Sequence, residues 1–414
     1  MTTPARNLAG ATWLTAGPLA RLIAALDRDG EEARPVGGAV RNALLGLPVG
    51  EIDVATTAVP EEVVRRVEAA GFKAVPTGIE HGTVTVVIDK TPFEVTTLRK
   101  DVETYGRHAK VEFGRDWKAD AERRDFTINA LSAAPDGTVF DYVGGLADLD
   151  ARRVRFIGDA ASRIAEDYLR ILRFFRFHAA YGRGEPDAAG LHACIAARAG
   201  LDQLSRERVR MEFLKLLVAQ RAEPVLIVMA DCGILTGVLD GVPNTVHFAR
   251  MAKIEAALSL PADAIRRLAA LAVLVPEDAE RLWQNLRLAN VEHERLAAMA
   301  EGWWRASPAL GERRARVLLY RLHAAHYADH IMLGWARSGA SADDPAWREL
   351  TTLPARWKPP TFPLKAADFI KRGIEQGPAL GAALRAAESA WVAGDFPNDE
   401  AALVRIADTA SKVR

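Results

Sequence analysis

The chain has few of the features that mark secreted, membrane-bound or disulfide-rich proteins. Only two of its 414 residues are cysteines, Cys194 and Cys232, and both lie in apolar sequence with helical spacing. This setting predicts buried thiols rather than a disulfide or a metal site. No run approaches the roughly 20 apolar residues of a membrane span, and the N-terminus lacks the basic start and apolar block of a signal peptide. These absences predict a cytoplasmic protein with no membrane partner.

An excess of charge of one sign is also absent. The 54 lysine and arginine residues balance 54 aspartate and glutamate residues, so the formal net charge is zero. A neutral total excludes a chain coated in positive charge, but it can hide a basic face. Arginines do gather in RRDF at 123–126 and in the segment 162–177. Charge therefore allows a nucleic-acid partner without showing one.

What is present is the composition of a globular protein, with 49% hydrophobic and 26% charged residues. A chain of this length is too long for one core, which predicts two or three domains. Segments rich in β-branched residues at 51–57 and 82–99 predict strands, and the patterns at 11–28 and 60–71 predict helices. From Ser162 onward the spacing is helical throughout. We therefore predict an α+β head with a small mixed sheet, followed by an all-helical remainder.

Two acidic residues in the strand-like segment EIDVATT indicate a possible chemistry. Glu51 and Asp53 would share one face of a strand, and like charges that close repel unless a cation lies between them. Hard oxygen ligands select Mg²⁺. Glu94, in FEVTTLR on the paired strand, would supply a third carboxylate. The trio predicts a metal-dependent phosphoryl-transfer site; the alternative is a solvated strand edge.

Glycines and arginines near these acids are candidates for holding a nucleotide. Gly37, Gly38 and Arg41 would hold a triphosphate through backbone N–H groups and a helix N-terminus. In RRDFTINA, the functional interpretation uses three polar side chains to grip a ribose and its phosphates: Arg124, Asp125 and Asn129. The alternative is that Asp125 merely caps a helix with a basic entry. This segment alone does not separate the two.

The segment SRIAEDYLRILRFFRF at 162–177 is more specific. Helical spacing places Arg163, Asp167 and Arg170 on one face, and also Glu166, Arg170 and Arg173. The alternative is an ordinary face of i,i+4 ion pairs, each contributing a few tenths of a kcal/mol.

Taken together, these segments resemble the class II CCA-adding tRNA nucleotidyltransferases and bacterial poly(A) polymerases, within the DNA polymerase β-like nucleotidyltransferase superfamily. GGAVRNALLG followed by EIDVAT is similar to the family pattern GG-x-V-R-D-x-L-L-G … D-x-D-x-A-T, and RRDFTINA matches RRDFT-x-NA. The motif E-D-x-x-R matches Glu166, Asp167 and Arg170, and a following R-x-x-x-E element resembles Arg208 and Glu212. The matched order covers roughly residues 35 to 215.

The resemblance implies a division into a catalytic head, a neck with a nucleotide-selecting helix, a body and a tRNA-binding tail. The boundaries we assign are 1–155, 156–222, 223–355 and 356–414. Two positions depart from the family pattern. Asn42 stands where aspartate is usual after the arginine, and Glu51 stands where the first metal-binding aspartate is usual. Glutamate keeps the charge but adds a methylene group, so the metal geometry would differ.

The resemblance implies template-independent addition of C, C and A to tRNA 3′ ends, from CTP and ATP, with release of pyrophosphate. Mg²⁺ would be held by Glu51, Asp53 and Glu94, with Glu94 closest to a general-base role. Arg41 would contact the triphosphate. The remaining nucleotide-binding set comprises Gly37, Gly38, Arg124, Asp125, Asn129, Glu166, Asp167, Arg170 and Arg173. The segment 100–117 resembles the flexible loop of members that add all of CCA. No obligate protein partner is indicated.

Base choice follows from hydrogen-bond chemistry. Cytosine and adenine each show an exocyclic amine beside an unprotonated ring nitrogen. Asp167, an acceptor when ionised, would take the amine hydrogen, and Arg170 would donate to the ring nitrogen. Uracil and guanine would face the wrong partners, which leaves buried polar groups unpaired at about 1–3 kcal/mol each.

Alternatives remain at this stage. A poly(A) polymerase shares the head and neck motifs, and a CC-adding or A-adding enzyme shares the same site. An RNA-binding protein with a degenerate head is the alternative from another class, supported only by Asn42 and Glu51.

Overall fold

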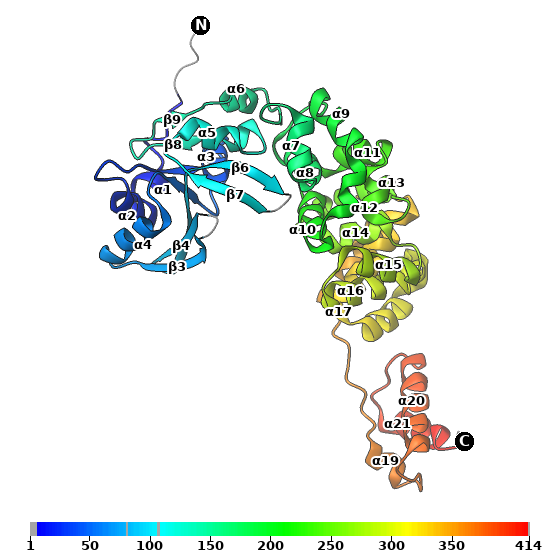
Figure 1. Ribbon diagram of the computed structural model, residues 1–414. Helices are drawn as coiled ribbons and strands as arrows, with labels where there is room; N and C mark the ends of the chain where they lie inside the picture. Colours follow the sequence, from blue (N-terminus) through cyan, green and yellow to red (C-terminus); the bar gives the residue numbers. More distant parts are fainter. Residues whose placement is uncertain (1–5, 80–81, 106–107, 413–414) are drawn as a thin grey trace. The chain divides into compact units, whose positions relative to one another are not determined.

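The computed structural model describes residues 6–79, 82–105 and 108–412 of the chain. The chain divides into two compact units, 1–238 and 239–414, and each is described by itself. The first unit contains a mixed sheet and the helices that follow it, and the second is helical (Figure 1). The α+β fold class predicted from the sequence is confirmed, and the finer division into head, neck, body and tail stays a prediction.

A seven-stranded mixed sheet organises the head. Its strand order is β3-β4-β5-β2-β1-β8-β9, in which β2 and β5 run parallel and the other neighbours run antiparallel. A separate two-stranded sheet pairs β6 with β7. The strands are β1 (Ala33–Val36), β2 (Asp53–Thr56), β3 (Lys73–Gly78), β4 (Thr83–Ile88), β5 (Thr91–Thr97), β6 (Arg99–Tyr105), β7 (His108–Phe113), β8 (Ser132–Ala133) and β9 (Val139–Phe140).

The hairpin predicted at 82–99 forms as β4 and β5. Asp89 and Lys90 connect the strands, both with positive φ, at 49° and 66°, which suits the tight two-residue turns whose twist matches a hairpin. Burial alternates along β4, so Val84, Val86 and Ile88 point into the core. Most of the segment 100–117, which resembles the flexible loop of the family, forms the β6–β7 hairpin.

Proline and glycine residues set several helix boundaries in the first unit. Pro60 opens the predicted helix at 60–71, and Gly71 follows its end with φ of 78°. The single helix expected at 11–28 is instead two, because Ala16 is extended and Gly17 has φ of 75°. The helices are α1 (Thr12–Thr15), α2 (Gly17–Leu26), α3 (Gly38–Leu44), α4 (Pro60–Ala69), α5 (Trp117–Glu122), η2 (Thr127–Asn129), α6 (Gly145–Asp150), α7 (Ala160–Glu166), α8 (Leu169–Tyr181), α9 (Ala188–Ala196), η3 (Arg198–Gln203), α10 (Arg206–Leu217) and α11 (Ala222–Asp231).

An aromatic core joins the head to α8. Phe126, just before η2, packs its ring 4.8 Å from Phe156 and 5.3 Å from Phe177 of α8, measured between ring centroids. Phe174 stacks on Phe156 at 5.4 Å. These rings are buried, and burying one phenylalanine contributes about 1.5–3 kcal/mol. The core therefore ties α8 firmly to the loop that contains RRDFTINA.

The second unit is all helical in the part that the structure describes. α12 (Ile234–Leu239) crosses the boundary, and then come α13 (Thr245–Ala257), α14 (Ala264–Ala272), α15 (Pro276–Leu286), α16 (Asn290–Ala300), η4 (Trp303–Arg305), η5 (Pro308–Leu310), α17 (Gly311–Ser338), α18 (Pro345–Arg356), α19 (Ala366–Ile370), α20 (Pro378–Ala393) and α21 (Glu400–Ala410). α17 is interrupted at His323, whose φ of 58° and ψ of 166° are not helical. The residues before this kink contact α20: Tyr320 lies 5.6 Å from Trp391 between ring centroids.

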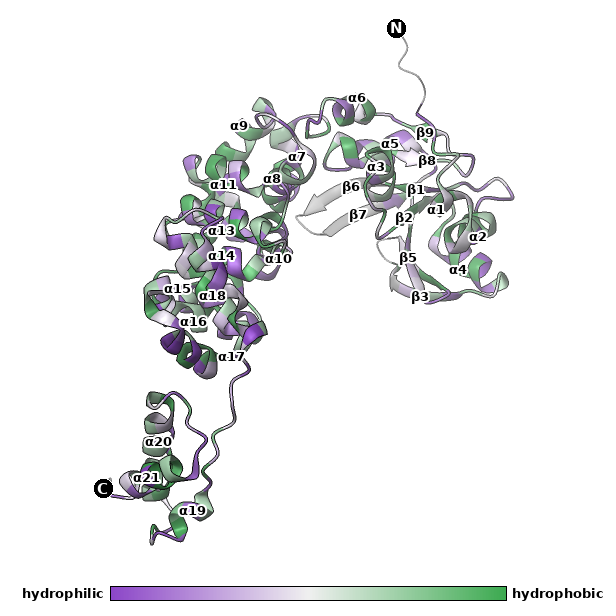
Figure 2. Cartoon of the chain, turned by 180° about the vertical axis from the view of Figure 1, so that it is seen from behind, coloured by the Kyte–Doolittle hydropathy of each residue, from purple (hydrophilic) through white to green (hydrophobic). Residues whose placement is uncertain are grey.

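Hydrophobic and hydrophilic residues are interleaved along the helices (Figure 2). Of the helices in the described residues, none has the length and apolar character needed to cross a membrane. Both cysteines are free thiols. Cys194 is buried as predicted, but Cys232 is only half-buried, so the prediction of a buried thiol is wrong there.

Candidate active site

Two of the three predicted carboxylates are brought together by the sheet. β2 and β5 are parallel neighbours, and Asp53 is the register partner of Glu94. Register partners on adjacent strands point to the same face, and both side chains are exposed. Glu51 lies two residues before β2, in a bend. The same-strand argument for Glu51 and Asp53 is therefore wrong in detail, although the two carboxylates still interact electrostatically.

The charge on Asp53 is unfavourable in the protein as it stands. Desolvation raises the pKa of the Asp53 carboxyl above its usual value, and the negative charge of Glu51 raises it further, while Arg124 acts in the opposite direction. Among the described residues, no three His, Cys, Asp or Glu side chains already converge as a metal cluster. Asp53 and Glu94 therefore share a face, and Arg124 is the cation that lowers the pKa of Asp53.

The glycine turn lies directly beside these acids. Val36, the last residue of β1, pairs with Asp53 across the sheet, and Gly37 follows it with φ of 66°, a conformation that favours glycine. A Cβ at Gly37 would lie 3.3 Å from the carbonyl oxygen of Asn129. Gly37 thus lets the chain turn into α3 and lets the two backbones approach each other.

Arg41 on α3 is a buried cation, 5% exposed. Its Nε and Nη2 donate to Oδ1 of Asn42 at 3.2 and 2.9 Å, Nη1 donates to Asn129 Oδ1, and Nη2 also donates to the Tyr181 hydroxyl at 2.7 Å. Burial lowers the pKa of Arg41. None of these partners is a carboxylate, and across the described residues Arg41 forms no ion pair. The predicted triphosphate ligand is therefore a cation whose partners are all neutral.

RRDFTINA does not start an α-helix. The turn after it is the short 3₁₀ helix η2, and Phe126, not Asp125, precedes it. Asp125 is buried and accepts from Arg173 at 2.8 and 2.5 Å and from Asn129 at 3.1 Å. Burial opposes ionisation of Asp125, but Arg173 and Asn129 outweigh it and hold its pKa below the usual value. The helix-cap interpretation is wrong, because a distant arginine captures the carboxylate.

Arg124 takes a different partner. Its Nη2 lies 3.0 Å from Asp120 of α5, and its Nη1 would be 3.6 Å from a Cβ at Gly37. Arg124 therefore lies at the glycine turn, within electrostatic range of Asp53.

The nucleotide-selecting segment is two helices rather than one. α7 ends at Glu166, and Asp167 is extended, with φ of −157°. Its Oδ1 accepts from the N–H of Leu169 at 3.1 Å, so the aspartate caps the start of α8 instead of continuing α7. The prediction that Asp167 and Arg170 share one uninterrupted helix face is wrong for this reason.

The two predicted base readers are each held by another residue. Arg208 of α10 donates to both oxygens of Asp167, at 3.2 and 2.6 Å. Arg170 pairs with Glu166 and donates to the carbonyl oxygen of Arg163 at 2.7 Å. A cavity of about 320 Å³ opens at this break, lined by Ala165, Glu166, Asp167, Tyr168, Gln203, Leu204, Ser205 and Arg208. Asp167 therefore lines a concave space together with Glu166, the partner of Arg170.

Sequence reasoning missed Tyr181, the last residue of α8, which contacts Arg41. The available signal was its spacing of four from Phe177 and eight from Arg173, which puts all three on one helix face.

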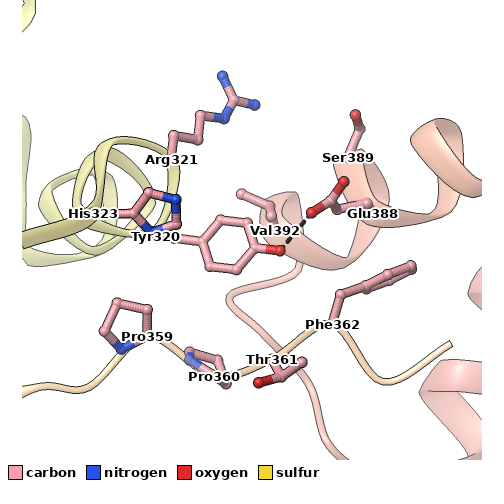
Figure 3. Close-up of a pocket in the computed structure, with 10 residues that line it drawn as sticks. All are labelled: Tyr320, Arg321, His323, Pro359, Pro360, Thr361, Phe362, Glu388, Ser389 and Val392. Atoms are coloured by element: carbon pink, nitrogen blue, oxygen red, sulfur yellow. Dashed lines mark hydrogen bonds between the residues drawn. The ribbon is translucent and has the colours of Figure 1, made fainter. Parts of the chain in front are cut away.

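A larger cavity, of about 620 Å³, lies in the second unit and contains none of the predicted site residues (Figure 3). There Tyr320 donates its hydroxyl to Glu388 at 2.5 Å, and burial together with Glu388 raises the pKa of Tyr320 to about 12. The bond joins α17 to α20 beside the kink at His323.

Known proteins match both the sequence and the fold. The family described as Poly A polymerase head domain matches residues 33–155, and the one described as Probable RNA and SrmB- binding site of polymerase A matches residues 188–245. The CCA tRNA nucleotidyltransferase 1, mitochondrial, of Danio rerio is 35% identical over 87% of this chain and 83% of its own. The CCA-adding enzyme of Limosilactobacillus fermentum is 31% identical over 94% and 96%. Other curated relatives reach 42 and 45% identity over about half of each protein.

A solved structure agrees over the whole length. The crystal structure of the Bacillus stearothermophilus CCA-adding enzyme, in complex with CTP, superposes with a TM-score of 0.75 and 26% identity and covers 100% of both chains. With the head motifs, the helical remainder and these relatives in agreement, the chain belongs to the family of CCA-adding tRNA nucleotidyltransferases.

Proposed function

We propose that this protein adds C, C and A to the 3′ ends of tRNA from CTP and ATP, with magnesium as its cofactor and pyrophosphate as its product. One observation carries the proposal. Val36, Asp53 and Glu94 are register partners across three neighbouring strands, so the glycine turn that follows Val36 lies at the same row of the sheet as the two acids. A phosphate-binding turn and metal-binding carboxylates are thus adjacent.

The donor set suits Mg²⁺. Carboxylate oxygens are the ligands that this ion prefers. Desolvation and the charge of Glu51 raise the pKa of Asp53 despite the opposing effect of Arg124, so a bound cation would favour its ionised form. Glu51, Asp53 and Glu94 would hold the ion. When bound, magnesium would lower the pKa of the attacking hydroxyl and neutralise the charge that develops on the phosphates.

Arg41 and Arg124 bind the phosphates of the nucleotide and neutralise their charge. A buried cation without a carboxylate is costly, and the arrival of an anion would compensate the charge of Arg41. The neutral partners Asn42 and Asn129 hold the guanidinium in place without neutralising it. Arg124, beside Gly37 and in electrostatic range of Asp53, adds a second cation. Asp125, Asn129 and Arg173 hold the ribose side of the site through their mutual hydrogen bonds.

Asp167 and Arg170 select the base. An ionised carboxylate has about four lone-pair positions, so Asp167 can keep Arg208 and still accept from an exocyclic amine. Arg170 must turn from Glu166 to donate to the ring nitrogen. Glu166 is therefore the residue that Arg170 leaves when a base binds. The pairing rejects uracil and guanine, because both present donors and acceptors in the wrong places.

The test is an incorporation assay with a tRNA transcript lacking CCA. CTP and ATP together should extend it by three nucleotides in the presence of Mg²⁺, CTP alone by two, and UTP or GTP by none. A ladder of many adenosines would identify a poly(A) polymerase, and a stop after two cytidines would identify a CC-adding enzyme. Extension only of a transcript that already ends in CC would identify an A-adding enzyme, and no extension would contradict the proposal.

A further inference from the structure

Five side chains form a hydrogen-bonded path whose two ends both lie on α8, so that the helix closes the path; we call it the polar ring. Arg41 donates to the hydroxyl of Tyr181 at 2.7 Å and to Asn129. Asn129 donates to Asp125 at 3.1 Å, and Asp125 accepts from Arg173 at 2.8 and 2.5 Å. The ring therefore links the head to two points of one neck helix.

Helical geometry allows α8 to hold both ends. Arg173, Phe177 and Tyr181 are spaced by four residues, so they lie on one face. The aromatic side chain of Phe177 lies between the guanidinium groups of Arg41 and Arg173. Its ring centroid is 5.3 Å from Cζ of Arg41 and 5.2 Å from Cζ of Arg173. Phe177 also stacks on Tyr181 at 5.8 Å. The polar ring thus surrounds an aromatic centre that keeps its members in register.

Tyr181 makes two kinds of contact with the guanidinium of Arg41. The centroid of its aromatic ring lies 3.9 Å from Cζ, a cation–π distance, and its hydroxyl accepts from Nη2. Asn42 and Asn129 take other N–H groups of the same guanidinium. A planar guanidinium has donors in a fixed fork, so these three neighbours set its orientation, and none of the three carries a negative charge.

We propose that Tyr181 is a positioning residue for the triphosphate: it orients Arg41 so that the guanidinium meets the phosphates of the incoming nucleotide. This inference rests on the proposed function, because it takes the nucleotide triphosphate as the anion. It assigns to α8, which presents Arg170 to the base at its first turn, a second role at its last residue. The neck helix then contributes to both ends of the bound nucleotide.

The test is Tyr181→Phe, which keeps the aromatic ring and removes one oxygen. Inorganic tripolyphosphate is the probe, and its dissociation constant is measured by calorimetry on the full chain with Mg²⁺. Losing a hydrogen bond to a charged group predicts about tenfold weaker tripolyphosphate binding. In the incorporation assay the KM should rise by a similar factor for CTP and for ATP, with kcat changed less and the KM for tRNA unchanged.

Tyr142→Phe is the matched control, because Tyr142 also accepts from an arginine of the head, Arg34, at 3.3 Å. It should leave tripolyphosphate binding and both nucleotide KM values within about twofold of wild type. Equal losses in the two variants, or unchanged tripolyphosphate binding in Tyr181→Phe, would overturn the assignment.

A double-mutant cycle with Arg41→Lys tests whether Tyr181 acts through Arg41. Lysine keeps the charge but lacks the fork of donors, so adding Tyr181→Phe to Arg41→Lys should weaken tripolyphosphate binding little further. Independent, additive losses would overturn the assignment. The binding measurement needs no turnover, so a wild-type protein that binds tripolyphosphate normally but extends no tRNA would contradict the proposed function and not this inference.

Discussion

Two groups of acids and arginines in this protein are built in opposite ways. In the second unit, Asp329 and Glu255 are each 1% exposed, and each forms ion pairs with two arginines. Asp329 pairs with Arg295 and Arg266. Glu255 pairs with Arg266 and Arg267. In the first unit, Asp53 and Glu94 form no ion pair with any residue that the structure describes. Matched charges stabilise a fold, whereas unmatched ones are available to a charged ligand.

The largest effect is expected on catalysis, when the charge of Asp53 is removed. Asp53→Asn removes an oxygen that we propose as a metal ligand, and we expect kcat for CTP addition to fall about a thousandfold or more, about 4 kcal/mol. The fold should be retained. Glu68→Gln, at an exposed position on α4, is the control. Activity of Asp53→Asn within a factor of ten of wild type would remove Asp53 from the reaction.

The same substitution has a pH signature. Because the folded-state pKa of Asp53 is raised above 3.8, its contribution to stability is present below about pH 4 and is lost as the pH rises through the folded-state value. The free energy of unfolding of wild type, measured relative to Asp53→Asn, should therefore decline from pH 4 upward. A difference that grows with pH would contradict the sign.

The second effect, on stability, is expected in the matched cluster. Asp329→Asn removes the charge of a buried carboxylate that accepts from both Arg295 and Arg266. Asp263 still pairs with Arg295, and Glu255 still pairs with Arg266. We therefore expect the free energy of unfolding to fall by about 2–3 kcal/mol. Urea denaturation followed by circular dichroism measures it. Asp408→Asn is the control, since Asp408 pairs with Arg372 at an exposed site and should cost less than about 1 kcal/mol. Equal losses in the free energy of unfolding for Asp329→Asn and Asp408→Asn would contradict the contrast between the two groups of charges.

The smallest effect concerns base choice. Asp167→Asn adds N–H donors where the carboxylate only accepts, so it can satisfy the carbonyl of uracil. We expect discrimination between CTP and UTP, as the ratio of kcat/KM, to fall about 10- to 100-fold. Asp202→Asn, at a loosely paired site 3.9 Å from Arg206, should leave the ratio unchanged. Unaltered discrimination in Asp167→Asn would place base selection elsewhere.

Local signals in the sequence were sufficient for much of the fold. Pro60 and Gly71 bound a helix as expected, and the β-branched runs around Asp89 and Lys90 form the expected hairpin. The side-chain partner of Asp125 was missed because it lies far along the chain. Asp125 has the chemistry of a helix cap, but Arg173, 48 residues away, occupies its carboxylate. No local pattern reports a partner at that separation.

The site was predictable as a set of residue types rather than as an arrangement. The pattern around Asp53 and Glu94 indicated carboxylates on adjacent strands, and the register confirms that they are partners. Their role as metal ligands stays a prediction. The break at Asp167 was missed because helical spacing alone continues through it, and only the bond to the N–H of Leu169 shows that the side chain caps a new helix.

The fixed spacing of Arg173, Phe177 and Tyr181 has a consequence for how this chain tolerates insertions and deletions. One extra residue between Arg173 and Tyr181 would rotate Tyr181 by about 100° around the axis of α8 and move it about 1.5 Å along it. The hydroxyl would then leave Arg41 while the helix itself remained intact. Length changes that surface loops absorb without harm would, within these two turns, separate Tyr181 from Arg41 and so disconnect the proposed phosphate-binding residues from the proposed base-selecting ones.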